Sequence, residues 1–413
     1  MINTLYLSYD GLADPLGQSQ ILPYLFGLSK NYKITILSFE KSENINKSYQ
    51  FISNKLKENQ IDWVPLKYSK RPPIISTIWD IYKLNKTVNK LIKSGVNLIH
   101  CRSYITSLVA LKIKRKHNIP FIFDMRGFYA DERVDGEIWD KNKLPFNKIY
   151  SFFKKKEKEF LEKAEYNISL TSNGKKEIES WKLPNQSPIS VIPCCTDDNL
   201  FKKENIKNVR KDIGFDEDDF VISYVGSIGT WYMLDEMLDF FKEVRKNKPN
   251  AKFLFITKDN PQLILEKALA KNIDVNSLKI QPSLREMMPS YIGLSDFSIF
   301  FILPVFSKKA SSPTKMGEIM NLGIPIICNE GVGDVDEIMN ECMPELLIKE
   351  FTKNEYQRII DLIINDYKPN EKRIIETSHN YYSLEKGVRK YKEVYQSILE
   401  GKITHDDTSP LLK

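Results

Sequence analysis

The sequence has few cysteines, and they show no paired pattern. The five cysteines are odd in number and irregularly spaced, and two of them, Cys194 and Cys195, are adjacent. This spacing argues against a disulfide framework, and the absence of any C-x-x-C pair argues against a zinc ribbon. We therefore expect free thiols and a reducing, cytoplasmic compartment.

Long apolar runs and targeting signals are missing too. No stretch approaches the roughly 20 apolar residues of a membrane span. The opening residues, MINTLYLSYDG, have neither the basic start nor the long apolar centre of a signal peptide. No apolar run leads into G-x-G-x-x-G or into a loop ending in G-K-[ST], which argues against a dinucleotide fingerprint and a Walker phosphate loop.

The remaining composition is that of an ordinary globular protein. The chain has 413 residues, of which 42% are hydrophobic and 28% charged, enough for two or three domains. Its net charge of +7 is a mild excess over this length. Such an excess suits an anionic substrate or a membrane surface, and we expect no nucleic acid partner.

Short apolar runs rich in β-branched and aromatic residues recur along the chain, and most precede a segment with helical spacing. They predict strands at residues 4–9, 32–39, 61–67, 97–101, 121–125, 167–172, 189–194, 220–226, 252–257, 278–282, 297–302 and 324–329. Nearly continuous apolar strands that alternate with helices are typical of parallel sheets covered on both faces.

These strands are too many for one sheet of usual width. The polar, weakly periodic residues 193–219 lie between two strand–helix series. We therefore predict an N-terminal domain at 1–195, a C-terminal domain at 196–380, a crossover helix at 381–400 and a flexible tail at 401–413. Two doubly wound domains imply a ligand cleft at the carboxyl ends of both sheets.

The most informative motif is SSPTKMGEIMNLGIPIICNEGVGDVDEI, residues 311–338. Pro313 is typical of a helix start, and Thr314 and Lys315 would then lie in the first turn, beside free backbone N–H groups. Such a turn can bind an anion. Glu318 follows one turn later. A well-capped helix before a strand would also explain this pattern, but the order of the whole segment favours a functional site.

Four segments together resemble retaining glycosyltransferases of the GT-B fold, of the family 4 type. They are residues 311–338, FDMRGFYADERVDG (123–136), VIPCCTD (191–197) and YVGSIGTWYMLDEMLDFF (224–241). Each segment alone matches the family's motif only loosely, but four matches in the family's order make the resemblance specific. The resemblance spans nearly the whole chain. It implies an α/β architecture of two doubly wound Rossmann-like domains facing a cleft, with the C-terminal helix returning to the N-terminal domain.

The resemblance also implies an activity. A sugar would pass from a UDP- or GDP-sugar, with retention, to a glycan or lipid-linked acceptor, in cell-surface polysaccharide or lipopolysaccharide biosynthesis. The C-terminal domain would bind the donor and the N-terminal domain the acceptor. No metal or other cofactor is expected, because hydrogen-bond donors and basic side chains can stabilise the charge that develops on the leaving diphosphate.

Some donor-site residues of the family are present and others are replaced. Glu318 matches the glutamate that holds the donor ribose, whereas a second glutamate would fall at Ala310. The family's phosphate-binding arginine and lysine fall at Ser227 and Tyr232, so we expect backbone N–H groups and other lysines to replace them. The predicted donor-binding residues are Gly17, Gln18, Gly226, Ser227, Thr230, Lys258, Pro282, Ser312, Thr314, Lys315 and Glu318.

In the N-terminal half, Arg126 stands near the position of the family's acceptor-side histidine. A guanidinium stays protonated and cannot act as a base, but it can contact the donor phosphate or sugar, with Asp124 or Asp131 holding it. The alternative is a buried ion pair that only fixes the loop. Arg126, Asp124 and Glu318 are the predicted catalytic residues.

The loop YDGLADPLGQSQILPYL, residues 9–25, follows the first predicted strand. In the resemblance, Gly17-Gln18 falls where the family has two glycines before the first helix, which we expect to begin at about Ser19. Gly17 would let the backbone approach the donor. The alternative is a plain turn at Asp14-Pro15.

A D-x-D pattern lies in GDVDE, residues 333–337. We interpret it as a helix start and not as a metal site. Asp334 is a typical N-cap with Glu337 three residues later, and two short carboxylates alone would make a sparse magnesium site.

Three basic stretches lie in the N-terminal half, at residues 78–93, 112–117 and 152–160. In the first, apolar residues such as Leu84 and Val88 share one helical face, and lysines lie mostly on the other. For any single stretch, a charged helix face in contact with water is a sufficient explanation. Together they favour reversible contact with anionic lipid, on the inner face of the cell membrane, which would suit a lipid-linked acceptor.

Two rival classes stay open. A sugar-nucleotide 2-epimerase of GT-B shape would need carboxylates and histidines in the cleft, and we expect His100 and His117 to be structural. A non-catalytic nucleotide-binding protein would explain the departures at Ala310, Ser227 and Tyr232.

Overall fold

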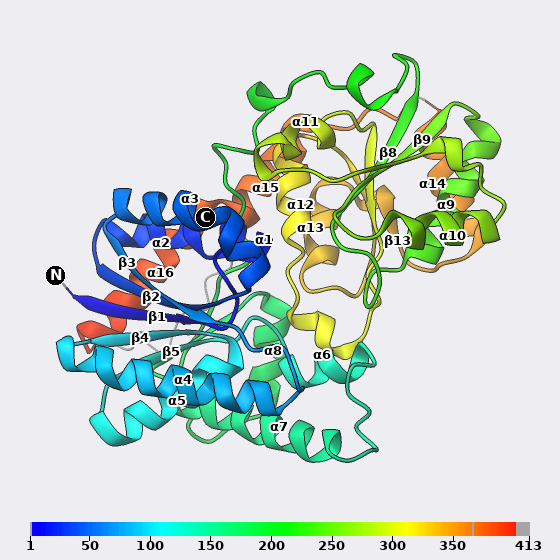
Figure 1. Ribbon diagram of the computed structural model, residues 1–413. Helices are drawn as coiled ribbons and strands as arrows, with labels where there is room; N and C mark the ends of the chain where they lie inside the picture. The colour runs from blue at the N-terminus through cyan, green and yellow to red at the C-terminus, as the bar shows by residue number, and fades with distance from the viewer. Residues whose placement is uncertain (1, 366, 402–413) are drawn as a thin grey trace. The chain divides into compact units, whose positions relative to one another are not determined.

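The computed structural model describes residues 2–365 and 367–401 (Figure 1). The chain forms two compact units, each described by itself below. The N-terminal unit holds the chain up to Pro193 together with the C-terminal helix that begins at Leu384, and the C-terminal unit is Cys194–Ser383. The predicted flexible tail lies, beyond Gly401, outside the described residues.

The N-terminal unit is built on a seven-stranded sheet of order β3-β2-β1-β4-β5-β6-β7 in which every strand pair is parallel. Its strands are β1 (Asn3–Ser8), β2 (Lys33–Glu40), β3 (Ile61–Lys67), β4 (Leu98–Arg102), β5 (Phe121–Asp124), β6 (Tyr166–Ser169) and β7 (Ile189–Val191). Its helices are α1 (Pro15–Gln20), α2 (Leu22–Ser29), α3 (Ser42–Glu58), α4 (Ile75–Leu91), α5 (Ser103–His117), α6 (Tyr129–Asp135), α7 (Phe146–Lys163), α8 (Ser172–Ser180) and α16 (Leu384–Leu399).

The C-terminal unit has a six-stranded parallel sheet of order β10-β9-β8-β11-β12-β13. Its strands are β8 (Phe220–Val225), β9 (Ala251–Ile256), β10 (Leu278–Gln281), β11 (Phe297–Phe300), β12 (Ile326–Asn329) and β13 (Leu347–Ile348). Its helices are α9 (Leu234–Asn247), α10 (Pro261–Ala270), α11 (Met288–Ile292), α12 (Thr314–Asn321), α13 (Val335–Cys342), α14 (Lys353–Ile364) and α15 (Glu371–Tyr382).

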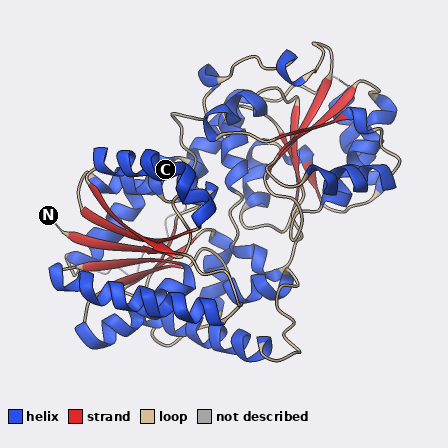
Figure 2. Ribbon diagram, in the orientation of Figure 1, coloured by secondary structure: helices blue, strands red, loops and turns tan. Residues whose placement is uncertain are grey.

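Helices cover both faces of each sheet, as Figure 2 shows. The strands between them are therefore buried on both sides, and β4, β5, β11 and β12 are buried throughout. This explains why their sequences are nearly continuous apolar runs. All the predicted strands are present, and the α/β class with two doubly wound units is confirmed. Only β13 escaped prediction, because two residues carry no periodic signal.

The C-terminal helix α16 packs on α2 in the N-terminal unit. Tyr391 and Tyr395 lie on its buried face. The Tyr391 hydroxyl donates to the Asp124 carboxylate over 2.9 Å, and the Tyr395 hydroxyl lies 2.8 Å from His100 Nδ1. The expected return of this helix to the N-terminal unit is confirmed.

The first helix begins earlier than expected. Helix α1 starts at Pro15, not near Ser19, with Asp14 in extended conformation before it. Proline at the first helical position has the φ angle that a helix needs and lacks only an N–H that would be unpaired there. The chain breaks at Ile21 and continues as α2. The loop after β1 is therefore shorter than the sequence suggested.

The five cysteines are free and buried. In the described part of the chain, no helix combines the length and the apolar character needed to cross a membrane.

Candidate functional site

The predicted donor-site residues of the C-terminal unit gather around the carboxyl ends of neighbouring strands. Gly226 follows β8 directly and has φ +132°, a conformation that favours glycine. A Cβ at this position would lie 2.6 Å from Lys315 Nζ. The glycine therefore makes room for the lysine ammonium beside the end of β8.

Lys315, in the first turn of α12, is buried over two aromatic rings. Its Nζ lies 3.8 Å from the ring centre of Tyr232 and 4.4 Å from that of Tyr224, and it donates to the Tyr224 hydroxyl over 3.2 Å. Burial lowers the pKa of Lys315 to about 7, against the opposing effect of the Glu318 carboxylate. An ammonium in this place would be stabilised by an added anion.

Glu318, one turn further along α12, forms an ion pair with Arg285. The Arg285 Nη1 lies 3.0 Å from the Glu318 Oε1. Burial raises the pKa of Glu318, and Arg285 offsets that rise only in part. Arg285 stands in a short turn after β10 and also lies over the Phe201 ring. Nothing in the sequence marked this arginine, because a single arginine in an aperiodic loop carries no signal.

The loop after β8 also holds Ser227 and Thr230, which are both exposed. The Ser227 carbonyl accepts a hydrogen bond from the Tyr224 hydroxyl. Thr230 has φ +57°, so the chain turns sharply there before Tyr232. The Asp259 carboxylate accepts from the Ile228 N–H and thereby ties this loop to the one after β9.

Four further predicted residues lie next to strands or at the start of α12 in the same unit. Lys258 and Pro282 are exposed and follow β9 and β10, and Ser312 precedes α12. The Ser312 hydroxyl accepts from the Cys194 N–H over 3.2 Å. Since β10, β9, β8 and β11 are neighbours in a parallel sheet, the segments that follow them meet at one edge. Thr314 is the first residue of α12.

The N-terminal unit brings Asp124 and Arg126 together at the end of β5. Arg126 Nη1 lies 3.6 Å from Asp124 Oδ1. Asp124, which is buried, also accepts from the Tyr391 hydroxyl and lies 3.4 Å from His100 Nε2. Burial alone would raise the pKa of Asp124, but Arg126 and His100 lower it to about 2. The second carboxylate considered for Arg126, Asp131, is bound by Tyr150 and Lys154.

His100 is part of the same buried group. Burial lowers its pKa although Asp124 favours the charged form, so the imidazole is neutral at pH 7. A carboxylate only accepts hydrogen bonds, so we assign the proton to Nε2, facing Asp124, and Nδ1 then accepts from the Tyr395 hydroxyl. This arrangement joins β4, β5 and α16, which is a structural role for His100 and also for Asp124.

The structure provides a packing reason for Gly17. A Cβ there would lie 2.2 Å from the Gly11 carbonyl oxygen, and so only glycine lets α1 lie against the preceding loop. The expectation that Gly17 precedes the first helix is wrong, because it lies inside α1. Gln18 Nε2 donates to the Ala13 carbonyl over 3.4 Å. Donor contact by Gly17 and Gln18 stays a prediction.

The D-x-D pattern lies at the start of α13. Asp334 occupies the N-cap position, as expected, but its side chain makes no capping hydrogen bond, so the predicted capping box is wrong. Asp336 instead accepts from the Gly331 N–H, at 3.0 and 3.2 Å from its two oxygens. This contact holds the loop between β12 and α13.

Two doubly wound parallel-sheet units, the second with a buried lysine and glutamate on the helix after its β11 strand, are the architecture of GT-B glycosyltransferases. The description "Glycosyl transferases group 1" matches residues 205–380, and "Glycosyltransferase Family 4" matches residues 28–200. The chain belongs to this glycosyltransferase family, as the sequence resemblance indicated. None of the curated proteins compared matches the sequence.

Solved structures show the same fold at low sequence identity. Sucrose-phosphate synthase from Thermosynechococcus elongatus has a TM-score of 0.74 at 14% identity, over 97% of this chain and 100% of that one. Anabaena Alr3699/HepE in complex with UDP and glucose has a TM-score of 0.70 at 12% identity, and the match covers 96% of this chain and 100% of that one. UDP-GlcNAc 2-epimerase from Neisseria meningitidis bound to UDP-GlcNAc has a TM-score of 0.58 at 12% identity, and the match covers 97% of this chain and 100% of that one.

Replacing Lys315 by methionine is expected to stabilise the protein at pH 7, because methionine fills the site without the free-energy cost of burying an ammonium. The folded-state pKa lies below the unfolded value, so the cost of Lys315 is full below about pH 7 and disappears as pH rises towards 10.5. Urea denaturation between pH 7 and pH 10 should show the gain shrinking. A methionine variant that is less stable at pH 7 would show that the lysine is a structural element.

Proposed function

We propose that this protein is a retaining glycosyltransferase that transfers a sugar from a UDP- or GDP-sugar to a glycan or lipid-linked acceptor. Family membership supports a glycosyltransferase. The observation that carries the proposal further is the buried Lys315, held beside Gly226 and one helical turn from Glu318. The buried ammonium of Lys315, next to the backbone of Gly226 where a Cβ would not fit, is suited to binding a diphosphate.

In this proposal, Lys315 and the backbone N–H groups between Gly226 and Thr230 contact the diphosphate of the donor. Negative charge grows on the diphosphate as the bond to the sugar breaks, so these contacts stabilise the transition state more than the ground state. Glu318, oriented by Arg285, accepts hydrogen bonds from the ribose hydroxyls. Ser312, Thr314, Lys258 and Pro282 complete the donor site.

The N-terminal unit would bind the acceptor. Arg126, held by Asp124, would contact the phosphate or the sugar as a fixed cation. Gly17 and Gln18 would add donor contacts. The reaction would need no metal, since basic side chains and backbone dipoles supply the positive field at the diphosphate. We place the activity in the cytoplasm, in cell-surface polysaccharide or lipopolysaccharide biosynthesis.

A thermal-shift screen with UDP, GDP and their sugars tests this function. The matching nucleotide should raise the melting temperature. At a hundredfold excess over its Kd it adds about 2.7 kcal/mol to the free energy of unfolding. The rise in melting temperature should persist with EDTA present. NMR should then show slow hydrolysis of the matching nucleotide sugar, with the released sugar first appearing in the anomeric configuration of the donor.

Other outcomes of the screen would contradict the proposal. A 2-epimer formed from added UDP-GlcNAc would favour the epimerase class. Binding without hydrolysis or transfer would favour a non-catalytic nucleotide-binding protein. A sugar released with inverted configuration would rule out retention, and loss of activity with EDTA would rule out metal independence.

A further inference from the structure

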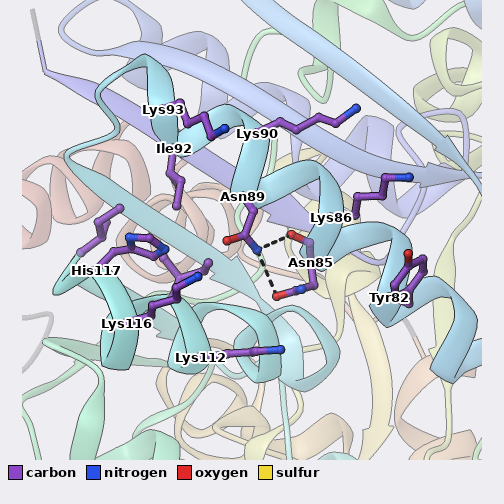
Figure 3. A pocket seen from close by; sticks show the side chains of 12 residues that line it. Tyr82, Asn85, Lys86, Asn89, Lys90, Ile92, Lys93, Lys112, Lys116 and His117 are labelled. Carbon is purple, nitrogen blue, oxygen red and sulfur yellow. Dashed lines mark hydrogen bonds between the residues drawn. The ribbon is translucent and has the colours of Figure 1, made fainter.

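A basic groove runs between α4 and α5 in the N-terminal unit. Its volume is about 820 Å³. Figure 3 shows lysines along its rim and the hydrogen-bonded Asn85 and Asn89 on α4 between them. The lining contains no acidic residue; its basic side chains are Lys86, Lys90, Lys93, Lys112, Lys116 and His117.

The lysines of the groove are not neutralised by neighbours. All five are exposed, and none forms an ion pair with any residue that the structure describes. Basic residues that point elsewhere from the same two helices are paired: Lys83 with Asp80, Lys114 with Glu165, and Arg115 with Glu159. The positive field of the groove is therefore uncompensated, and it favours an anionic partner.

An exposed apolar stripe continues the groove towards the start of α4. Its four side chains are between 53% and 64% exposed: Ile75, Ile78, Trp79 and Tyr82. Trp79 and Tyr82 stack with ring centres 5.3 Å apart, and Tyr82 also lines the groove. The spacing i, i+3, i+4, i+7 puts the stripe on one helical face, opposite the buried Leu84 and Val88.

The same face carries the lysines further along the helix. Lys86 and Lys90 continue the spacing that starts at Ile75, and Lys93 lies in the short 3-10 turn (Ile92–Ser94) directly after the helix, so one helical face about 25 Å long is apolar at its beginning and basic at its end. The sequence separated apolar from basic residues across this helix. The structure separates them along the length of the helix as well. The exposed apolar side chains lie near its start, and the exposed lysines lie near its end.

We propose that the α4–α5 face, defined by this stripe and this groove, docks onto an anionic membrane surface. Trp79 and its apolar neighbours enter the boundary between headgroups and acyl chains, and the groove lysines contact lipid phosphates. The third basic stretch, residues 152–160, does not take part in the same way, because Lys154 pairs with Asp131 and Lys156 with Glu159. No residue of this face belongs to the proposed donor site.

Flotation with vesicles tests the docking surface on the full chain. The protein should float with vesicles that contain phosphatidylglycerol, less so at high salt, and not with pure phosphatidylcholine. The triple variant Lys86→Gln, Lys90→Gln, Lys93→Gln should bind at least about tenfold more weakly, because each lysine contributes attraction near the surface. The double variant Ile78→Gln, Trp79→Gln should lose binding to these vesicles. The shift in tryptophan fluorescence that Trp79 gives when the unmodified protein binds vesicles should be absent from this variant.

A matched control changes the same charge elsewhere on the N-terminal unit. The variant Lys30→Gln, Lys57→Gln, Lys141→Gln removes three exposed lysines outside the groove and should bind within about twofold of the unmodified protein. All variants change exposed side chains and should keep their melting temperature. Equal losses in both lysine triples would overturn the proposal, as would binding to heparin without binding to vesicles. Donor binding is measured separately, so failure of one proposal leaves the other standing.

Discussion

Replacing Glu318 by alanine should abolish the rise in melting temperature that the matching nucleotide sugar produces. The carboxylate is buried in the second turn of α12 and oriented by Arg285 at 3.0 Å, so its loss would remove a charged acceptor for the ribose hydroxyls. Hydrogen bonds to charged groups contribute about 1.5–3 kcal/mol each, and losing two corresponds to about a 100-fold or greater loss of donor affinity.

The matched control for Glu318 is Glu266→Ala, which removes an exposed carboxylate from α10 of the same unit. It should leave the ligand-induced shift unchanged. Glu318→Gln keeps the shape of the side chain and should retain part of the binding. Isothermal calorimetry would measure each affinity. A full ligand-induced shift in Glu318→Ala would show that the glutamate does not contact the donor.

Replacing Asp124 by alanine should destabilise the N-terminal unit by about 3–5 kcal/mol, the usual cost of removing one partner from a buried ion pair. The carboxylate is the common partner of Tyr391, His100 and Arg126, and so its loss affects β4, β5 and α16 together. Calorimetry should show a melting temperature lower by about 6–20 °C for a unit of this size.

Two controls separate the charge of Asp124 from a general effect of substitution. Asp124→Asn keeps an acceptor for the Tyr391 hydroxyl and should lose less stability than alanine. Asp62→Ala removes an exposed carboxylate on β3 and should stay within about 0.5 kcal/mol of the unmodified protein. An alanine variant at position 124 with unchanged stability would contradict the structural role.

The contribution of Asp124 should also depend on pH. Its folded-state pKa of about 2 lies below the ordinary value of 3.8. A depressed carboxyl pKa gives stability that is present above pH 3.8 and is lost as pH falls towards 2. The stability difference between the unmodified protein and Asp124→Ala, measured by urea denaturation, should therefore be constant from pH 5 to pH 7 and shrink in more acidic solution.

Much of the fold could be predicted from the sequence because its determinants are local. Parallel strands buried on both faces need apolar residues at nearly every position, and runs such as residues 220–226 show this directly. The helix from Thr314 was predictable because its signal is also local: the proline before it acts within the first turn. The two-residue β13 carries no such signal, and its pairing with β12 is a property of the sheet.

The candidate site was only partly predictable. Lys315 and Glu318 were identified from their place at a helix start, but the partner of Glu318 was not. Arg285 is 33 residues away along the chain, and their contact depends on β10 and the segment after β11 ending at one edge of the sheet. The rings of Tyr224 and Tyr232 around Lys315 depend on the same edge.

By itself, the sequence determined the α/β class, the two strand–helix series and the positions of the residues that suit an anion. These follow from periodicity and from helix caps, which act over a few residues. The tertiary structure alone decided which charges are paired. It buried Asp124 among Arg126, His100 and Tyr391, and it left the lysines between α4 and α5 without an ion-pair partner among the residues that the structure describes. The reason is that burial and pairing depend on which distant segments pack together.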